Sequence, residues 1–236
     1  MPMQPSSSPI HPPFGGPLRV LFLHGTSESS GPGRGFHTIL KFLDPRVIHR
    51  TVVLPRRGPM SDGLESARVA DEVIIEPNLV QNPIEPWKRA MSRGDRDASS
   101  GLQSLRFLGN VARAAVGLRR LSDLAKRGGY DLIYCIGTNA DFVDGILSTA
   151  TSVPALWHVR YTTIPGLVAP IHRLLSASAD VRRIVCVPRA ATALFSHCRQ
   201  KIRLVESEID TDELNPSLAR FIQNEIIGAV TEPFAC

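Results

Sequence analysis

The stretch Leu18-Arg19-Val20-Leu21-Phe22-Leu23-His24 is a short, almost continuous apolar run, and a glycine-rich segment follows it. Such a run is typical of a strand buried on both faces of a parallel sheet. Comparable runs alternate along the chain with segments of helical periodicity; they lie at 47–54, 72–76, 130–136, 155–159, 183–187 and 202–205. This alternation predicts an α/β fold with an open, mostly parallel Rossmann-like sheet and helices on both faces.

The bulk composition indicates an ordinary globular protein. The chain has 236 residues, 43% of them hydrophobic and 21% charged, with a formal net charge of +5. This charge is compatible with anionic partners such as phosphates or a membrane surface, but it selects none of them. Its four cysteines form no C-x-x-C pair, so we expect reduced thiols in a cytoplasmic protein.

We expect three segments along the chain. Residues 1–17 hold Pro, Ser and Gly without the apolar centre of a secretory signal, which predicts a disordered leader. Residues 18–216 form the Rossmann-like domain. Residues 217–236 are either a tail or the start of a second domain, and Arg220 to Cys236 could be a strand-like fragment or a short helix. No apolar run reaches the length of a bilayer span.

Candidate ligand contacts follow the strands, because open α/β sheets bind ligands at the carboxyl ends of their strands. The first loop, expected to run from Thr26 to a helix beginning at Phe36, contains Gly31, Gly33, Arg34 and Gly35. Glycines let backbone N–H groups approach an anion, and Arg34 could pair with a phosphate. The segment matches neither G-x-G-x-x-G nor a Walker loop, so a plain flexible connection is the alternative.

Two further strand ends carry polar side chains. Thr138 and Asn139 follow the strand at 130–136, where either could cap the next helix or bind a sugar hydroxyl. His158 and Arg160 are two residues apart at the end of the strand at 155–159 and so point to the same side. An imidazole beside a guanidinium suits a phosphorylated or hydroxylated ligand, although His158 could equally be a structural histidine.

Charged segments are interpreted more conservatively. The acidic residues of 206–210 are expected to be solvated rather than to bind a metal. Basic residues gather between 88 and 127. They could form a solvated helix face, or they could bind anionic lipid. Few aromatic residues accompany them, which argues against nucleic acid. In the long helix expected at 102–127, one stripe is expected to hold Leu105, Leu108, Ala112, Ala115, Arg119 and Ser122.

Four stretches together carry a resemblance to one enzyme family. They are Val20 to Gly35, Tyr130 to Cys135 with Gly145 in the helix that follows, Val153 to Arg160, and Ala179 to Val187 with Lys201 to Pro216. In order and spacing they resemble the N-terminal domain of family-four GT-B glycosyltransferases. Pro188 and Glu208 depart from the family pattern, which usually has Ser and Gly at these places.

The resemblance implies a function through analogy. In such enzymes the N-terminal domain handles the acceptor, and a C-terminal Rossmann domain binds the nucleotide sugar through paired glutamates. Transfer usually proceeds with retention and without a metal or other cofactor. His158 would then be the catalytic residue facing the transferred sugar, and Gly31 to Gly35 would approach the donor phosphates or the acceptor.

The implied partners are a nucleotide sugar and a glycan or lipid-linked acceptor, as in polysaccharide or glycolipid biosynthesis. No paired-glutamate domain follows within these residues. We therefore expect an acceptor-side lobe that has little activity without a donor-binding partner subunit. One alternative is a non-catalytic accessory lobe that binds a partner glycosyltransferase or the inner membrane surface through the 106–127 helix. Another is a different α/β protein, such as an epimerase lobe or a flavodoxin-like binder.

Overall fold

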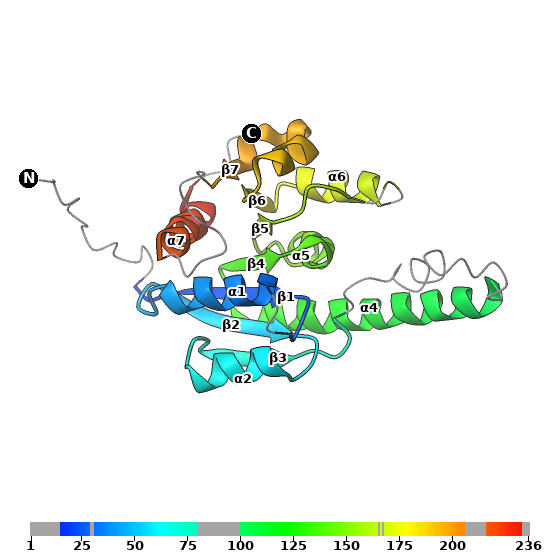
Figure 1. The fold of residues 1–236 in the computed structure, drawn as a ribbon, viewed down its shortest axis with the longest axis horizontal. Helices are drawn as coiled ribbons and strands as arrows, with labels where there is room; N and C mark the ends of the chain where they lie inside the picture. Colours follow the sequence, from blue (N-terminus) through cyan, green and yellow to red (C-terminus); the bar gives the residue numbers. More distant parts are fainter. Residues whose placement is uncertain are drawn as a thin grey trace, which may run out of the picture.

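The computed structural model describes residues 15–28, 31–79, 100–164, 166, 168–205 and 216–232 (Figure 1). Within them lies a seven-stranded sheet in the order β3-β2-β1-β4-β5-β6-β7, with every neighbouring pair parallel. The strands are β1 (Leu18–His24), β2 (Ile48–Leu54), β3 (Glu72–Ile75), β4 (Leu132–Ile136), β5 (Ala155–Val159), β6 (Val181–Cys186) and β7 (Ile202–Leu204). The predicted fold class is confirmed.

Helices cover both faces of this sheet. One face packs against α1 (Gly31–Phe42), α2 (Pro59–Ser66) and α7 (Pro216–Thr231). The other packs against α4 (Ser100–Gly128), α5 (Thr138–Thr151), α6 (Ala169–Ala177) and the 3₁₀ helix η1 (Arg189–Lys201). Val20 and Phe22 lie in the first cluster, whereas Leu21 and Leu23 lie in the second. Burial on both faces explains why the strand reads as a continuous apolar run.

The topology fixes where ligands can approach. The chain moves outward from β1 through β2 to β3, then crosses back so that β4 lies on the other side of β1. Strand order therefore reverses between β1 and β4. At such a switch point the loops at the carboxyl ends diverge and leave a crevice for a ligand.

The segment after Pro216 forms the helix α7, which is one of the two alternatives for this part of the chain. Leu218, Ile222 and Ile226 are buried in the same apolar cluster as α1 and the central strands. Helix α7 also contacts α1 directly. It therefore covers part of the sheet as an integral element of this domain.

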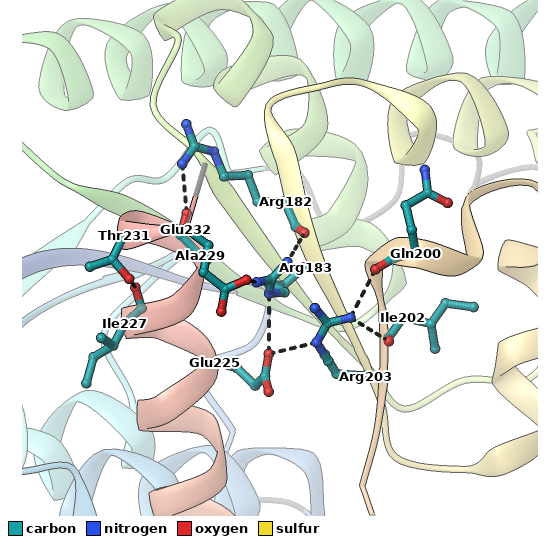
Figure 2. A network of polar contacts seen from close by, with 10 residues as sticks. All are labelled: Arg182, Arg183, Gln200, Ile202, Arg203, Glu225, Ile227, Ala229, Thr231 and Glu232. Atoms are coloured by element: carbon teal, nitrogen blue, oxygen red, sulfur yellow. Dashed lines mark hydrogen bonds and ion pairs between the residues drawn. The ribbon is translucent and has the colours of Figure 1, made fainter. Parts of the chain in front are cut away.

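Polar contacts hold α7 against β6 and β7 (Figure 2). Arg183 of β6 forms ion pairs with Glu225, at 3.5 Å, and with Glu232. Arg203 of β7 lies 3.4 Å from the same Glu225 carboxylate. Arg182 donates to the carbonyl of Ala229 at 3.0 Å. Because one partner of each pair is largely buried, these contacts orient the helix as well as attach it.

Two helix boundaries differ from the expected ones. Helix α1 begins at Gly31 rather than Phe36, so the glycine-rich segment is its first turns and not a loop. The sequence also predicts a short helix at 64–70, and the structure has this helix, α2, at 59–66. Pro59 starts it, and the Ser61 hydroxyl accepts a hydrogen bond from the Gly58 N–H and donates one to the Gly58 carbonyl. Proline at the first helical position is favourable, although the same Pro also fits a turn.

The expected stripe on α4 is wrong. Ala112, Ala115 and Arg119 are exposed, whereas Leu121 and Ala125 are buried. Figure 1 shows that α4 runs far beyond the sheet, and the buried apolar side chains among those described on α4, Leu121 and Ala125, lie near its C-terminal end. The side chains of Leu105 and Leu108 lie outside the described residues, and periodicity alone could not locate the point of contact.

Cys135, Cys186 and Cys198 are free and buried in the structure. Among the described helices, none combines the length and the hydropathy that crossing a bilayer requires. The leader up to residue 14 and the segment at 80–99 lie outside the described residues.

Candidate functional site

The carboxyl ends of β1, β4 and β5 bring two histidines into one row. His24 pairs in register with Ile136, and Ile136 pairs with His158. Registered residues of parallel strands project to the same face, so both rings lie on the side of the sheet that α1 and α7 cover. The site is therefore built at the switch point and on one face of the sheet.

His158 is fully buried beside a tyrosine. Its Nδ1 atom lies 2.5 Å from the hydroxyl oxygen of Tyr134, and its Nε2 atom has no hydrogen-bond partner among the described residues. Burial, followed by the charge of Arg160, lowers the pKa of His158 to about 3. The ring is thus neutral at physiological pH. A hydrogen bond to a ligand hydroxyl suits this group better than proton transfer does.

His24 is a second candidate, which the sequence analysis missed. Its ring stacks on Phe36 of α1 with centroids 4.7 Å apart, and only 2% of the residue is exposed. Neither ring nitrogen has a hydrogen-bond partner within the described part of the chain. Burial lowers the pKa of His24 to about 4, so it is also neutral. Buried polar atoms without partners are costly and often mark a place where a ligand or water binds.

Arg160 connects the end of β5 to α1. A methyl group added at Gly35 would lie 2.5 Å from Nη1 of Arg160, so the guanidinium lies directly against the glycine backbone. Gly33 is needed for a different contact, since a methyl there would come within 2.5 Å of the carbonyl oxygen of Glu28. The glycines therefore permit close approach, one toward the site and one toward the preceding loop.

Substituting Gly35 by alanine is expected to move the Arg160 guanidinium while changing the free energy of unfolding by less than about 1 kcal/mol. The displaced atom is the end of a flexible side chain, and alanine favours a helix over glycine. NMR signals of the Arg160 side chain would report the movement. Gly63→Ala is the matched control, because its added methyl would meet its nearest neighbour at an ordinary 3.9 Å. An unmoved Arg160 signal in Gly35→Ala would contradict this geometry.

The other predicted contacts have mixed outcomes. Gly31 begins α1, and the side chain of Arg34 is exposed. Helix α5 begins at Thr138, and its cap is Gly137 with a φ of 97°, so neither Thr138 nor Asn139 is the capping residue. The side chains of these two residues lie outside the described part of the structure. The structure therefore brings together Gly35, His158 and Arg160.

Metal ligation has no support in the described residues. No group of three or more His, Cys, Asp and Glu side chains among them could hold a metal ion. The acidic segment 206–210 lies outside these residues.

The sequence matches no family model. It also matches no curated protein. Solved structures do share the fold. Alr3699/HepE of Anabaena, in complex with UDP and glucose, is 17% identical with a TM-score of 0.55; the match covers 80% of this chain and 44% of that one.

Two further structures show the same similarity. A glycosyltransferase of Rickettsia africae is 11% identical with a TM-score of 0.50, over 80% of this chain and 43% of that one. A UDP-N-acetylglucosamine 2-epimerase is 14% identical with a TM-score of 0.50, and the match covers 83% of this chain and 50% of that one. This chain thus has the fold of one lobe of GT-B-like proteins. It spans half or less of the length of these neighbours.

Proposed function

We propose that this chain is the acceptor-side lobe of a sugar-nucleotide-dependent glycosyltransferase of the GT-B type. In this proposal a donor-binding half completes the site, and transfer proceeds with retention and without a metal. The observation that supports it best is the convergence of Arg160, the glycine face of α1 and two neutral histidines at the switch point.

The chemistry of these groups fits a phosphorylated sugar. The Arg160 guanidinium lies near the N-terminal end of α1, where the helix dipole also favours negative charge. A phosphate between them would be attracted by both. The neutral ring of His24 offers one donor and one acceptor, and His158, whose Nδ1 contacts Tyr134, offers its Nε2 atom. Sugar hydroxyls can pair with either kind of group.

UDP-glucose is the first ligand to test, because one structural neighbour was solved with UDP and glucose. We expect millimolar binding to the full chain, with NMR shifts of the backbone amides of 33–35 and 158–160. Weak affinity is expected because one lobe cannot enclose the ligand as two closed lobes do. Micromolar binding would instead favour a self-contained nucleotide binder, and shifts away from these residues would contradict the proposed site.

His158→Ala is expected to reduce turnover about a hundredfold when a donor-binding lobe is supplied, since one hydrogen bond to the reacting sugar is lost. Because His158 is fully buried, His158→Gln, which keeps polar atoms, is needed as a second variant. Thermal unfolding of both variants separates loss of chemistry from loss of fold. Unchanged turnover in a folded variant would remove His158 from the site.

A further inference from the structure

A buried polar cluster lies on the opposite face of the sheet from the two histidines. The carboxylate of Asp141 in α5 accepts a hydrogen bond from the Cys135 thiol at 3.0 Å and one from the Tyr161 hydroxyl at 2.5 Å. The same hydroxyl lies 2.7 Å from Nε2 of His172 in α6. One tyrosine oxygen therefore joins α5, α6 and the segment that follows β5.

The cluster is packed in the core. Asp141 is fully buried and His172 is 1% exposed. The His172 ring contacts Trp157 and Phe195, with centroids 5.3 Å away in both cases. A polar network at such a place is costly unless every member is satisfied, and apolar residues would pack there at lower cost. The buried polar cluster therefore indicates a role other than stability.

The position of Tyr161 in the chain suggests that role. Tyr161 directly follows Arg160, and Asp141 lies in the first turn of the helix that begins at Thr138. We propose that Tyr161 is a positioning residue of the candidate site: its hydroxyl, held between Asp141 and His172, fixes the end of β5 against the start of α5. This inference rests on the proposed function, because the segment it fixes carries His158 and Arg160.

The hydroxyl can hold both partners whether Asp141 is charged or neutral. When Asp141 is ionised, Tyr161 donates to it, and the Nε2–H of His172 donates to Tyr161. When Asp141 is protonated, it donates to Tyr161, which then donates to an unprotonated Nε2. Both arrangements keep the same heavy atoms in contact, and only the tautomer of His172 differs.

Several titratable groups surround this chain of hydrogen bonds. Cys135 of β4, Cys186 of β6 and Asp144 of α5 interact electrostatically with Asp141, and His197 of η1 interacts with His172. Burial raises the pKa of Asp141 to about 7, so this carboxylate changes charge near neutrality.

Tyr161→Phe tests the proposal without any ligand. The amide of Val187 donates to the carbonyl of Val159 at 3.1 Å, at the end of β5. We expect hydrogen exchange of this amide to speed up about tenfold in Tyr161→Phe, because the strand end loses its anchor. Tyr130→Phe, which removes a hydroxyl outside the cluster, is the control and should leave the exchange unchanged.

The ¹⁵N signals of the His172 ring provide a second measurement, because they report its tautomer. A general loosening of the structure would not produce the same change. In the wild-type chain at pH 8 the ¹⁵N signals should show the Nε2–H tautomer, and in Tyr161→Phe they should shift. Unchanged exchange of Val187, or the other tautomer at pH 8, would overturn the inference.

Titration with UDP-glucose separates this inference from the proposed function. If both hold, Tyr161→Phe weakens the ligand-induced shifts at 158–160, and Tyr130→Phe does not. If the wild-type chain shows the ligand-free signatures but no response to UDP-glucose, the proposed ligand is wrong, and the positioning of the strand end by Tyr161 is still supported. Shifts of equal size in Tyr161→Phe and the wild type would overturn the inference.

Discussion

Asp141→Asn is expected to raise the free energy of unfolding by up to about 4 kcal/mol at pH 8 and to change it little at pH 4. Asp141 is fully buried, and the loss of hydration on burial raises its pKa from 3.8 to about 7, against the opposing hydrogen bonds from Cys135 and Tyr161. Each pKa unit between the folded and unfolded chain corresponds to about 1.4 kcal/mol.

The direction of this pH dependence follows from how many protons the folded and unfolded chains bind. Between pH 4 and pH 7 the folded chain keeps the Asp141 proton that the unfolded chain has already lost. Raising the pH through this window therefore favours unfolding, and the loss is complete above the folded pKa of about 7. Asparagine is neutral at every pH and can still accept a hydrogen bond from Tyr161. The free energy of unfolding of the variant therefore does not fall as the pH rises through this window.

Denaturant unfolding at pH 4, 6 and 8 measures the effect. The wild-type chain should become less stable than Asp141→Asn progressively across this range. Asp123→Asn, on the exposed surface of α4, removes a carboxylate without burial and should differ little from the wild type at each pH. A constant difference between Asp141→Asn and the wild type at all three values would contradict the assignment.

Ile222→Ala is expected to destabilise the chain by about 2–5 kcal/mol, because it leaves a cavity under α7. Ile222 is completely buried in the cluster that α7 shares with α1 and the central strands. Ile227 lies on the same helix but is only partly buried, so Ile227→Ala should cost clearly less.

Chemical denaturation of the two variants provides the comparison. Equal losses, or losses near zero in both, would mean that α7 does not pack as described. A large loss in Ile222→Ala alone would support α7 as a structural element of this domain.

Parts of the fold followed from local chemistry alone. The alternation of buried strands and helices predicted the sheet, because burial on both faces leaves a continuous apolar run such as that of β1. The boundary at Gly31 was missed since glycine usually signals a loop. In the helix, Gly33 lies close to Glu28 and Gly35 lies close to Arg160, and these contacts join segments that are not adjacent in the sequence. Tertiary contact, rather than periodicity, also decided which face of α4 is buried.

The site was predictable only in part for a similar reason. His158 and Arg160 share a side of one strand, which spacing reveals. The position of His24 beside these two residues becomes apparent only when β1 is paired in register with β4. That pairing joins segments about 110 residues apart. The Asp141 cluster assembles from β4, α5, α6 and the segment that follows β5, and none of its members forms a recognisable motif alone.

The late position of α7 has a consequence for biosynthesis. It is the last described element to leave the ribosome, and until then the apolar surface that it covers on the sheet has no partner among the described helices that precede it. The central pairing of β1 with β4 must also wait for more than 100 residues of synthesis. Sheets with such distant contacts fold slowly, and their folding intermediates expose apolar surface and are prone to aggregation. Nascent chains of this protein should therefore depend on chaperones until α7 has left the ribosome.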